Sequence, residues 1–509
     1  MSKKNFYITT PIYYVNADPH IGTAYTTIVC DVLARFKRME GFKVKFLTGT
    51  DEHGQKIEQS AQKLGMETQD FVDQVAKKFV SLFELMNISN DDFIRTTEER
   101  HKAGVFELWN LLKEKGHIYL GKYAGWYAVR DESFYSEDEL VNGKAPTGAE
   151  VEWIEEESYF FDLSKWQDPL LDFYNKNPDF VFPKYRLNEI ISFVKGGLRD
   201  LSVSRTSFKW GIPVPGDTDH IMYVWLDALT NYISALGFPD KEKDFKGFWP
   251  ADLHMVGKDI TKFHAIYWPA FLMAAGIELP KQIVSHGWWL NEGEKISKSL
   301  GNVIDPVGLV KEYGLDQVRY YLMREMSFGN DGSFSQSSFN ARINSELANK
   351  IGNLAQRTLS MVYKNCDGSI PSYNKDQIDS FYKEYKILQE AAGLFNKIKE
   401  KVDSYQFHQA LEEIISFVDN INIFVDQTAP WDLKKTDTKK MSEVLYITME
   451  AIRYFSIILI PFIPDSANKF LDQLAVPKDN RSFEFLNKSN ALVGNKILQP
   501  VGVFPRIVV

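Results

Sequence analysis

The first fifty residues alternate between strand-like and helix-like patterns of apolar and polar positions. Residues 6–10 are all β-branched or aromatic and predict a strand. Residues 21–39 then place apolar side chains at helical spacing, and Asp18 followed by Pro19 fits an N-cap with proline at the first helical position. Residues 43–47 resume a strand. This strand–helix–strand unit predicts a parallel sheet whose ligand site lies at the carboxyl ends of its strands.

The middle of the chain changes its pattern twice. Residues 116–224 are dense in aromatic side chains, contain acidic runs and give only scattered strand signals, so we interpret them as a domain inserted into the sheet domain. The pattern of the sheet domain returns near residues 223–227 and continues in the strand-like residues 253–256 and 282–285. It closes with the loop 293–299. The sheet domain is therefore expected in two halves.

The last third of the chain has a helical pattern throughout. Apolar residues recur at helical spacing over residues 378–402 and 407–425, and Pro461 and Pro464 end a third helix near Ile460. The predicted fold class is therefore α/β, a Rossmann-type parallel sheet with an inserted domain, followed by an all-α helical bundle. The expected boundaries are 1–115 and 225–300 for the two halves of the sheet domain, 116–224 for the insertion, 301–344 for a linking fold and 345–509 for the bundle.

Composition and cysteine usage narrow the class of protein. The 509 residues are 44% hydrophobic and 25% charged, which is typical of globular proteins and leaves room for several domains. The two cysteines, Cys30 and Cys366, exclude a disulfide framework and a paired-cysteine zinc site, and they favour a reducing, cytoplasmic setting. The first residues lack the apolar core of a secretory signal, and the longest apolar run, residues 454–463, is too short to span a membrane.

Charge is distributed unevenly along the chain. The formal net charge is −9, which argues against a protein that coats nucleic acid through bulk electrostatics. From residue 340 onward there are 21 Lys and Arg against 20 Asp and Glu, whereas residues 1–339 hold 38 against 48. The negative excess therefore lies in the first two-thirds, and the neutral last third is the part best suited to meet a polyanion.

Two short motifs carry candidate phosphate chemistry. His20 and Gly22 fall at the start of the first predicted helix, where free N–H groups and the helix dipole favour an anion. Taken alone, such a pair is more often a helix start with no ligand. Lys295 and Lys298 stand with Ser297 in a loop after the last predicted strand, where two ammonium groups and a hydroxyl suit a triphosphate. A lone lysine-rich loop is otherwise usually a solvated surface.

Together and in this order, the two motifs resemble the HIGH and KMSKS signatures of class I aminoacyl-tRNA synthetases. The resemblance narrows to the methionyl-tRNA synthetases and covers nearly the whole chain. It is carried by residues 10–16 (TPIYYVN), 48–54 (TGTDEHG), 224–228 (VWLDA), 257–259 (GKD), 263–264 (FH), 268–269 (WP), 286–287 (HG), 295–299 (KISKS), 353–357 (NLAQR) and 429–431 (APW).

The resemblance implies a site for each small substrate. In that family the methionine side chain lies in an aromatic pocket, which suits a thioether because sulfur–ring contacts and dispersion hold it. Singly, these aromatic residues also fit ordinary core packing. The implied methionine-binding residues are Ile12, Tyr14, Asp51, Trp225, Ala228, Tyr232, Phe263, His264 and Trp268, with Asp51 taking the ammonium group. The implied ATP-binding residues are His20, Gly22, Thr23, Gly257, Asp259, His286, Trp289, Lys295, Ser297 and Lys298. Of these, His20, Lys295 and Lys298 are expected to be catalytic, with ATP entering together with Mg²⁺.

Two features depart from the family pattern. Thr23 stands where the first signature has its second histidine, so a hydroxyl or the lysines must supply that phosphate contact. The inserted domain lacks the cysteine pairs that many family members use to bind zinc. Asp131, Glu132 and nearby aromatic residues suggest a knuckle of similar shape held by packing alone. We therefore expect no structural zinc and no other resident metal.

The helical bundle is expected to read RNA. Asn353, Arg357 and Trp431 match the positions that read the CAU anticodon in the family. The spacing of four places Asn353 and Arg357 on the same side of one helix, where they can bond and stack with splayed bases. Without the resemblance, these residues also fit an ordinary polar helix face.

Two further contacts with tRNA are implied by the resemblance. The inserted domain is expected to meet the acceptor end of the tRNA. Residues 301–344, with Asp316, Arg319 and Tyr320, look like the linking fold that contacts its inner corner.

These features predict a methionine–tRNA ligase, which activates L-methionine with ATP and transfers it to the 3′ adenosine of tRNA(Met), the initiator included. We expect a cytoplasmic monomer without a membrane partner. Four alternatives fit less of the chain. A branched-chain enzyme needs an editing insertion larger than residues 116–224, and a cysteine enzyme needs zinc ligands that are missing. A nucleotidyltransferase would leave the helical third unexplained, and a non-enzymatic RNA-binding relative would not need Asp51, His20 and the two lysines.

Overall fold

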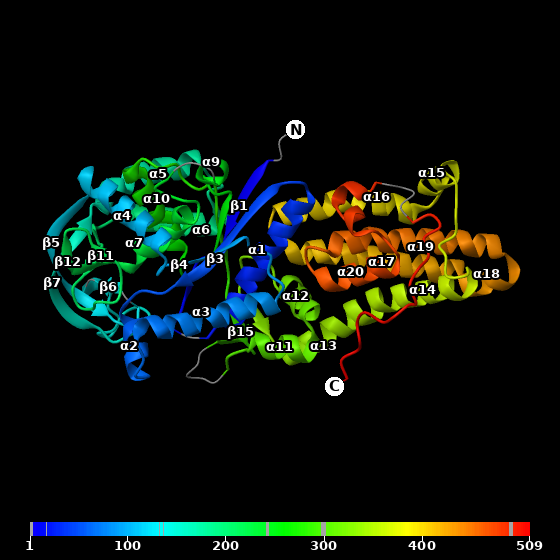
Figure 1. Ribbon diagram of the computed structural model, residues 1–509, viewed down its shortest axis with the longest axis horizontal. Helices are drawn as coiled ribbons and strands as arrows, with labels where there is room; N and C mark the ends of the chain where they lie inside the picture. Colours follow the sequence, from blue (N-terminus) through cyan, green and yellow to red (C-terminus); the bar gives the residue numbers. More distant parts are fainter. Residues whose placement is uncertain are drawn as a thin grey trace. The chain divides into compact units, whose positions relative to one another are not determined.

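The computed structural model describes residues 4–16, 18–131, 133–135, 137–240, 244–296, 302–487 and 492–508. The chain divides into two compact units, each of which joins segments that are far apart in the sequence (Figure 1). The first unit is Met1–Pro19 with Lys43–His286, and the second is His20–Phe42 with Gly287–Val509.

The first unit is built on a parallel sheet. Its central strand β1 (Asn5–Thr9) lies between β3 (Lys43–Asp51) and β13 (Leu253–Gly257), and β14 (Ile283–His286) follows β13. These strands are largely apolar and buried, as expected where helices cover both faces of a parallel sheet. The short strands β2 (Tyr13–Tyr14) and β4 (Asp92–Arg95) pair with β3, and β8 (Val181–Phe182) pairs with β14, again in parallel.

Helices and one π-helical turn surround this sheet. The turn η3 (Phe263–Tyr267) leads directly into α10 (Trp268–Ala275), and π-turns of this kind are frequent at functional sites. The large side chains Tyr7, Trp109, Tyr232 and Trp268 are fully buried in the core beneath them. The other helices are α2 (Gln55–Lys63), α3 (Thr68–Leu85), α4 (Glu99–Glu114), α7 (Val224–Leu229), α8 (Asn231–Ser234) and α9 (Asp244–Phe248).

The predicted insertion, residues 116–224, contains two small antiparallel sheets and two helices. It also supplies β8 to the parallel sheet, so part of this segment is continuous with the sheet domain. The first small sheet is β5 (Ile118–Ala128), β6 (Ser133–Tyr135), β7 (Glu152–Phe161) and β9 (Leu201–Ser202). The second is β10 (Ser204–Arg205), β11 (Pro213–Val214) and β12 (Asp217–Met222), and the helical elements are η1 (Glu137–Glu139), η2 (Leu163–Trp166), α5 (Gln167–Lys176) and α6 (Lys184–Lys195).

The second unit is mainly helical, as the sequence predicts for the last third of the chain. It includes α1 (Ile21–Met39) and a small sheet of β15 (Trp289–Asn291), β16 (Glu294–Lys295) and β17 (Gly332–Phe334). The helices that follow are α11 (Pro306–Tyr313), α12 (Leu315–Arg324), α13 (Gln336–Arg342), η5 (Ile343–Gly352), α14 (Asn353–Asn365), α15 (Lys375–Glu384), α16 (Lys386–Asp403), α17 (Phe407–Thr428), α18 (Pro430–Thr436), α19 (Thr438–Leu459), α20 (Pro464–Gln473), η6 (Lys478–Asn480) and η7 (Phe483–Phe485).

The predicted start of the first helix is wrong in its cap. The helix begins at Ile21 as expected, but its N-cap is His20, whose Nδ1 accepts from the Gly22 amide at 3.0 Å. Asp18 instead forms an exposed ion pair with Lys78, and Pro19 precedes the cap. An imidazole nitrogen can satisfy a free N–H at a helix start as a carboxylate does, which the usual N-cap preferences do not anticipate.

The helical pattern over residues 378–402 is also interrupted. The chain leaves the helical conformation at Tyr385, with φ −99° and ψ 113°, so two helices, α15 and α16, replace the single predicted one. The end predicted near Ile460 is confirmed by α19. Within the described residues, no helix combines the length and the apolar character needed to cross a membrane.

Three residues of the predicted linking fold lie inside the protein and not on a surface that could meet RNA. Arg319 is fully buried, where it donates to Asp31 at 2.7 Å and to the main-chain oxygens of Pro461 and Phe462. Tyr320 is fully buried and donates to Glu346, and the carboxylate of Asp316, which is 3% exposed, accepts from the Ser466 amide. These side chains join α1, α12 and the segments around α20, so the link they make is within the second unit.

Candidate functional site

Three of the predicted ATP-binding residues meet at the carboxyl ends of β13 and β14. Gly257 and His286 are register partners at the ends of the two strands, and the Lys258 amide donates to the His286 carbonyl at 2.9 Å. A Cβ at Gly257 would lie 2.7 Å from Oδ1 of Asp259, so glycine allows that carboxylate to fold back over the strand end. This edge is where parallel sheets commonly bind ligands.

Strand β2 brings two predicted methionine-binding residues side by side. Tyr14 is the register partner of Asp51, at the carboxyl end of β3. Asp51 is only 8% exposed, and Ile12 packs against the core of the first unit. A carboxylate in such sheltered surroundings attracts a cation more strongly than it would in water.

The aromatic residues of the predicted methionine pocket form one cluster. Trp225 stacks face to face on Phe263, with ring centroids 3.8 Å apart and planes inclined by 12°. His264 meets Trp225 edge-on at 6.2 Å, and Tyr232 lies 6.0 Å from Trp268. Trp225 and Phe263 are half-buried, whereas the other three are buried, so the stacked pair is the accessible wall of the cluster. Ala228, one turn after Trp225 on α7, is 5% exposed.

Hydrogen bonds fix the polar atoms at the buried end of this cluster. Nδ1 of His264 lies 3.0 Å from the Ile260 carbonyl, which can only accept, so this nitrogen carries the hydrogen. Burial lowers the pKa of His264 to about 4, so the ring is neutral and its Nε2 accepts from the Tyr232 hydroxyl at 2.6 Å. The Tyr232 ring also lies on that of His254, with centroids 3.9 Å apart. Tyr232 is therefore held in one orientation.

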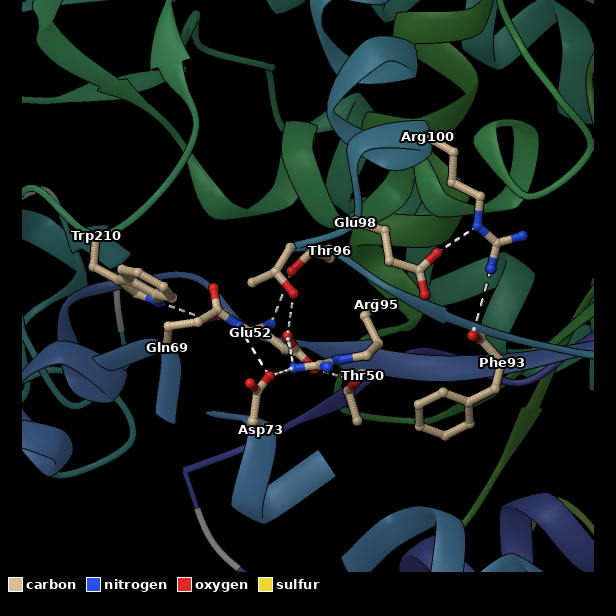
Figure 2. A network of polar contacts seen from close by, with 11 residues as sticks. Thr50, Glu52, Gln69, Asp73, Phe93, Arg95, Thr96, Glu98, Arg100 and Trp210 are labelled. Carbon is tan, nitrogen blue, oxygen red and sulfur yellow. Dashed lines mark hydrogen bonds and ion pairs between the residues drawn. The ribbon is translucent and has the colours of Figure 1, made fainter. Parts of the chain in front are cut away.

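Glu52, next to Asp51, anchors the end of β3 from its other side. Its carboxylate is fully buried and receives Arg95 in a two-pronged contact at 2.6 and 2.9 Å, with Thr50 donating at 2.7 Å. Figure 2 shows this side chain among its partners, with Trp210 donating to the Glu52 carbonyl at 2.6 Å. This network anchors the chain directly after β3, one residue beyond Asp51.

The start of α1 offers a defined hydrogen-bond donor. Since Nδ1 of His20 accepts from Gly22, a neutral His20 ring carries its hydrogen on Nε2, and the residue is exposed. A Cβ at Gly22 would come within 2.8 Å of the imidazole, so this position needs glycine for the cap to form. Thr23 is 6% exposed and thus contributes little surface here.

Only part of the second phosphate motif lies in the described part of the chain. Lys295 is exposed on β16, with its ammonium group 4.4 Å from the centre of the Trp288 ring, whereas Ser297 and Lys298 lie outside the described residues. Asn302 donates to the Lys295 carbonyl at 3.1 Å, which joins the two sides of this loop. Trp289 is 4% exposed and packs edge-on against Tyr25 in the interior of the second unit.

Two of the predicted anticodon-binding residues share a pocket on the helical bundle. The Arg357 guanidinium lies 5.5 Å from the centre of the Trp431 ring, and both residues are exposed. Asn353 is exposed one turn before Arg357 on α14. Ala429 has φ +42° and separates α17 from α18, so the chain turns sharply just before Trp431. The pocket is lined by Leu354, Arg357, Thr358, Met361, Val425, Pro430, Trp431, Leu445 and Thr448.

The knuckle expected in the insertion has a small apolar centre. Ala128, Ala145 and Ala149 are buried together, and Tyr135 packs against them while donating to Asp131 at 3.0 Å. Glu132 lies outside the described residues. In the described part of the chain, no three His, Cys, Asp or Glu side chains are arranged to hold a metal ion. The absence of a structural zinc ion stays a prediction, and metal analysis of the purified protein tests it.

Comparisons with known proteins agree along the whole chain. The family model for class I tRNA synthetases (M) matches residues 6–153 and 138–359, and that for the anticodon binding domain of methionyl tRNA ligase matches residues 379–508. The methionine–tRNA ligase of Rickettsia felis is 59% identical over 506 residues, which cover 99% of each chain. The chain belongs to the methionyl-tRNA synthetase family. The methionine–tRNA ligase of Brucella suis biovar 1 is 51% identical to this chain, and the match covers 100% of this chain and 99% of the Brucella protein.

Solved structures of methionyl-tRNA synthetases share the fold. The Mycobacterium tuberculosis enzyme in complex with methionyl-adenylate has a TM-score of 0.93 and 48% identity, and covers 99% of this chain and 100% of that chain. The apo form of the same enzyme has a TM-score of 0.88 and 45% identity. This match covers 100% of this chain and 99% of the apo chain. The chain is thus a class I aminoacyl-tRNA ligase by family, with the predicted parallel-sheet and helical parts both confirmed.

Sequence reasoning missed several buried polar residues of this synthetase around Asp51 and Trp225. Glu52 and Arg95 were not singled out, although the pair fixes the end of β3. Asp227 and His101, which meet in the core at 2.8 Å, were also missed. The sequence does contain a sign of such residues, namely a charged or imidazole side chain inside an otherwise apolar run. Asp227, between Leu226 and Ala228, is an example.

Proposed function

We propose that this synthetase is a methionine–tRNA ligase. It joins L-methionine and ATP, which enters with Mg²⁺, to give methionyl-adenylate and pyrophosphate, and then transfers the methionyl group to the 3′ adenosine of tRNA(Met), initiator tRNA included. The observation that carries the proposal is the aromatic cluster that contains Trp225, Phe263 and Tyr232. It belongs to the same unit as the strand pair that sets Tyr14 beside Asp51. A linear thioether fits aromatic walls, and a sheltered carboxylate fits an ammonium group.

In the first step, a methionine carboxylate oxygen forms a bond to the α-phosphorus of ATP while the bond to pyrophosphate breaks. We assign the methionine side chain to Ile12, Trp225, Ala228, Tyr232, Phe263, His264 and Trp268, and the ammonium group to Asp51 with Tyr14 beside it. With the ammonium group engaged, the substrate carboxylate is left free to react. No protein nucleophile is required, because positioning and charge stabilisation supply the rate.

ATP is assigned to the strand ends and to the two phosphate motifs. Gly257, Asp259 and His286 line the ends of β13 and β14. The His20 ring, with its hydrogen on Nε2, can donate to a phosphoryl oxygen, and Gly22 and Thr23 follow it on α1. Lys295, Ser297 and Lys298 are assigned to the phosphates that leave as pyrophosphate, since ammonium groups offset the charge that develops there. We also assign Trp289 to this substrate on family resemblance.

In the second step, the 2′-hydroxyl oxygen of the terminal adenosine attacks the methionyl carbonyl carbon, AMP leaves, and the hydroxyl proton is released. The anticodon is assigned to Asn353, Arg357 and Trp431, of which the last two share one pocket. Stacking on tryptophan and hydrogen bonding from arginine and asparagine suit splayed RNA bases. The enzyme is proposed to act as a cytoplasmic monomer without a resident zinc ion.

Methionine-dependent exchange of pyrophosphate into ATP tests the proposal. The purified protein is expected to catalyse exchange with L-methionine and Mg²⁺, and faster than with any of the other standard amino acids. No exchange with methionine, or faster exchange with a different amino acid, would refute the proposed substrate.

A further inference from the structure

A buried carboxylate that the proposed chemistry does not use lies beside the methionine-binding residues. Asp227 on α7 is 1% exposed, and it accepts from Nδ1 of His53 at 2.7 Å and from Nε2 of His101 at 2.8 Å. Burial alone would raise the pKa of this carboxyl group, but attraction to His53 and the hydrogen bonds from both histidines outweigh it and hold the pKa at about 2. The carboxylate is therefore ionised and has a donor on each oxygen.

The two histidines connect Asp227 to three other elements of the first unit. His53 lies two residues beyond the end of β3, whereas His101 belongs to α4. His101 continues the chain of contacts, because its Nδ1 lies 3.0 Å from Oγ of Ser234 on α8. Helices α4 and α8 touch closely here, since a Cβ at Gly104 would lie 2.8 Å from the Cβ of Ser234. One carboxylate thus ties together β3, α4, α7 and α8.

Three of these four elements carry residues assigned to methionine. Asp51 ends β3, Trp225 and Ala228 flank Asp227 on α7, and Tyr232 precedes Ser234 on α8. The ammonium-binding carboxylate and the side-chain pocket therefore come from separate segments whose spacing depends on how β3, α7 and α8 are joined. A fully satisfied buried polar network can fix such a spacing, because any other arrangement would leave a donor or a charge unpaired.

We propose that Asp227, acting through His53 and His101, is a positioning residue that sets the distance between Asp51 and the methionine side-chain pocket. We place Asp227 outside the substrate contacts because each of its carboxylate oxygens already accepts from a histidine. The inference rests on the proposed function, since it concerns the fit of methionine. A positioning role differs from a purely structural one in its effect on the two substrates. Loosening the network should weaken the binding of methionine and leave the binding of ATP unchanged.

The two histidines allow matched substitutions at fixed positions. An asparagine amide nitrogen lies near Nδ1 of the histidine it replaces, and a glutamine amide nitrogen lies near Nε2. His53 uses Nδ1 toward Asp227, whereas His101 uses Nε2. His53→Asn and His101→Gln should therefore keep the donor to Asp227, while His53→Gln and His101→Asn should lose it.

The measurement is the KM for methionine and for ATP in pyrophosphate exchange, together with kcat. For Asp227→Asn, which offers one acceptor oxygen where two donors need one each, we expect the KM for methionine to rise about tenfold or more. The KM for ATP should stay within about twofold. His53→Gln and His101→Asn should show the same split, whereas His53→Asn and His101→Gln should stay within about threefold of the unaltered enzyme.

Glu450→Gln provides a control for the loss of a buried carboxylate elsewhere. Glu450 is fully buried in the second unit, where Arg453 donates to both of its oxygens. This variant should lower the thermal midpoint and leave the KM for methionine unchanged.

The outcomes separate the two proposals. Unchanged KM for methionine in folded Asp227→Asn, His53→Gln and His101→Asn would refute the positioning role while leaving the proposed function intact. If Asp227→Asn fails to fold, the paired histidine variants decide: equal KM values within each pair refute the role. Absence of methionine-dependent exchange in the unaltered enzyme would instead refute the proposed function.

Discussion

The two predicted recognition sites of this synthetase are built in opposite ways. In the first unit, the residues assigned to methionine are sheltered, with Tyr232 1% and His264 2% exposed and with hydrogen bonds to fixed partners. In the second unit, Arg357 and Trp431 lie exposed on the helical bundle and contact each other through the guanidinium and the ring. One site is buried and prearranged, and the other is open.

The difference follows from the size of the two ligands. A single amino acid offers few contacts, so its site must exclude water and hold each polar atom in place before binding. An RNA loop brings its bases to the protein, and stacking faces must be reachable from outside. Substitutions in the methionine site should therefore remove most of the activity with methionine. Substitutions in the exposed tRNA site should weaken tRNA binding, and their effect should be smaller than that of the methionine-site substitutions.

Asp51→Asn should have the largest effect. Loss of the carboxylate removes a sheltered charge pair with the substrate ammonium group, a change that typically costs about 2–5 kcal/mol. We expect kcat/KM for methionine in pyrophosphate exchange to fall by about 10²-fold or more, with the KM for tRNA unchanged. A fall of less than about threefold would show that Asp51 does not hold the ammonium group.

Acid should weaken the first unit through His264. Burial lowers its pKa in the folded protein to about 4, whereas an unfolded chain takes up this proton near 6.5. Between these values the unfolded state binds more protons, so stability is full above about pH 6.5 and falls as the pH drops toward 4, by about 3 kcal/mol in total.

His264→Gln tests this by removing the titrating ring. Urea unfolding midpoints at pH 7, 6, 5 and 4 should fall less steeply for the variant than for the unaltered protein. Parallel pH profiles for the two proteins would mean that another group causes the acid sensitivity.

Trp431→Ala should affect only the open site. Stacking of a base on an aromatic ring is worth about 1–3 kcal/mol, so we expect the KM for tRNA(Met) in aminoacylation to rise about tenfold or more. Methionine-dependent pyrophosphate exchange should be unchanged. If the substitution abolished exchange, the assignment of Trp431 to the anticodon site would be wrong.

Arg357→Lys should give the smallest effect. The charge is kept, but the flat guanidinium that lies against Trp431 is lost, and such a contact at an exposed site is worth about 0.5–1 kcal/mol. The KM for tRNA(Met) should rise about two- to fivefold, as measured by aminoacylation at fixed salt. A change as large as that of Trp431→Ala would indicate that Arg357 makes a direct hydrogen-bonded contact with a base.

Periodicity predicted the elements that carry both sites but missed their local geometry. The strand and helix patterns over residues 6–10 and 21–39 correspond to β1 and α1, because burial on defined faces leaves a regular spacing. The cap at His20 was missed since imidazole is not among the usual N-cap side chains. The break at Tyr385 was missed because apolar spacing continues across it while the backbone does not.

The polar contacts between distant segments could not be predicted from one sequence. His53 and Asp227 lie 174 positions apart, and neither has a neighbour along the chain that indicates the pairing. Arg319 illustrates the converse: a charged residue near a predicted RNA-binding region is normally exposed, yet here Asp31 on α1 balances it in the interior. Such pairings depend on tertiary packing, which apolar periodicity does not encode.

Aminoacylation of tRNA tests the central claim most directly, since it requires both sites in one chain. Purified enzyme with labelled L-methionine, ATP and Mg²⁺ is incubated with tRNA(Met) transcripts that carry either the CAU anticodon or an altered one. We expect methionine to become attached to the 3′ adenosine of the CAU transcript and far more slowly to that of the altered transcript. No labelled tRNA(Met), or equal labelling of both transcripts, would contradict the account.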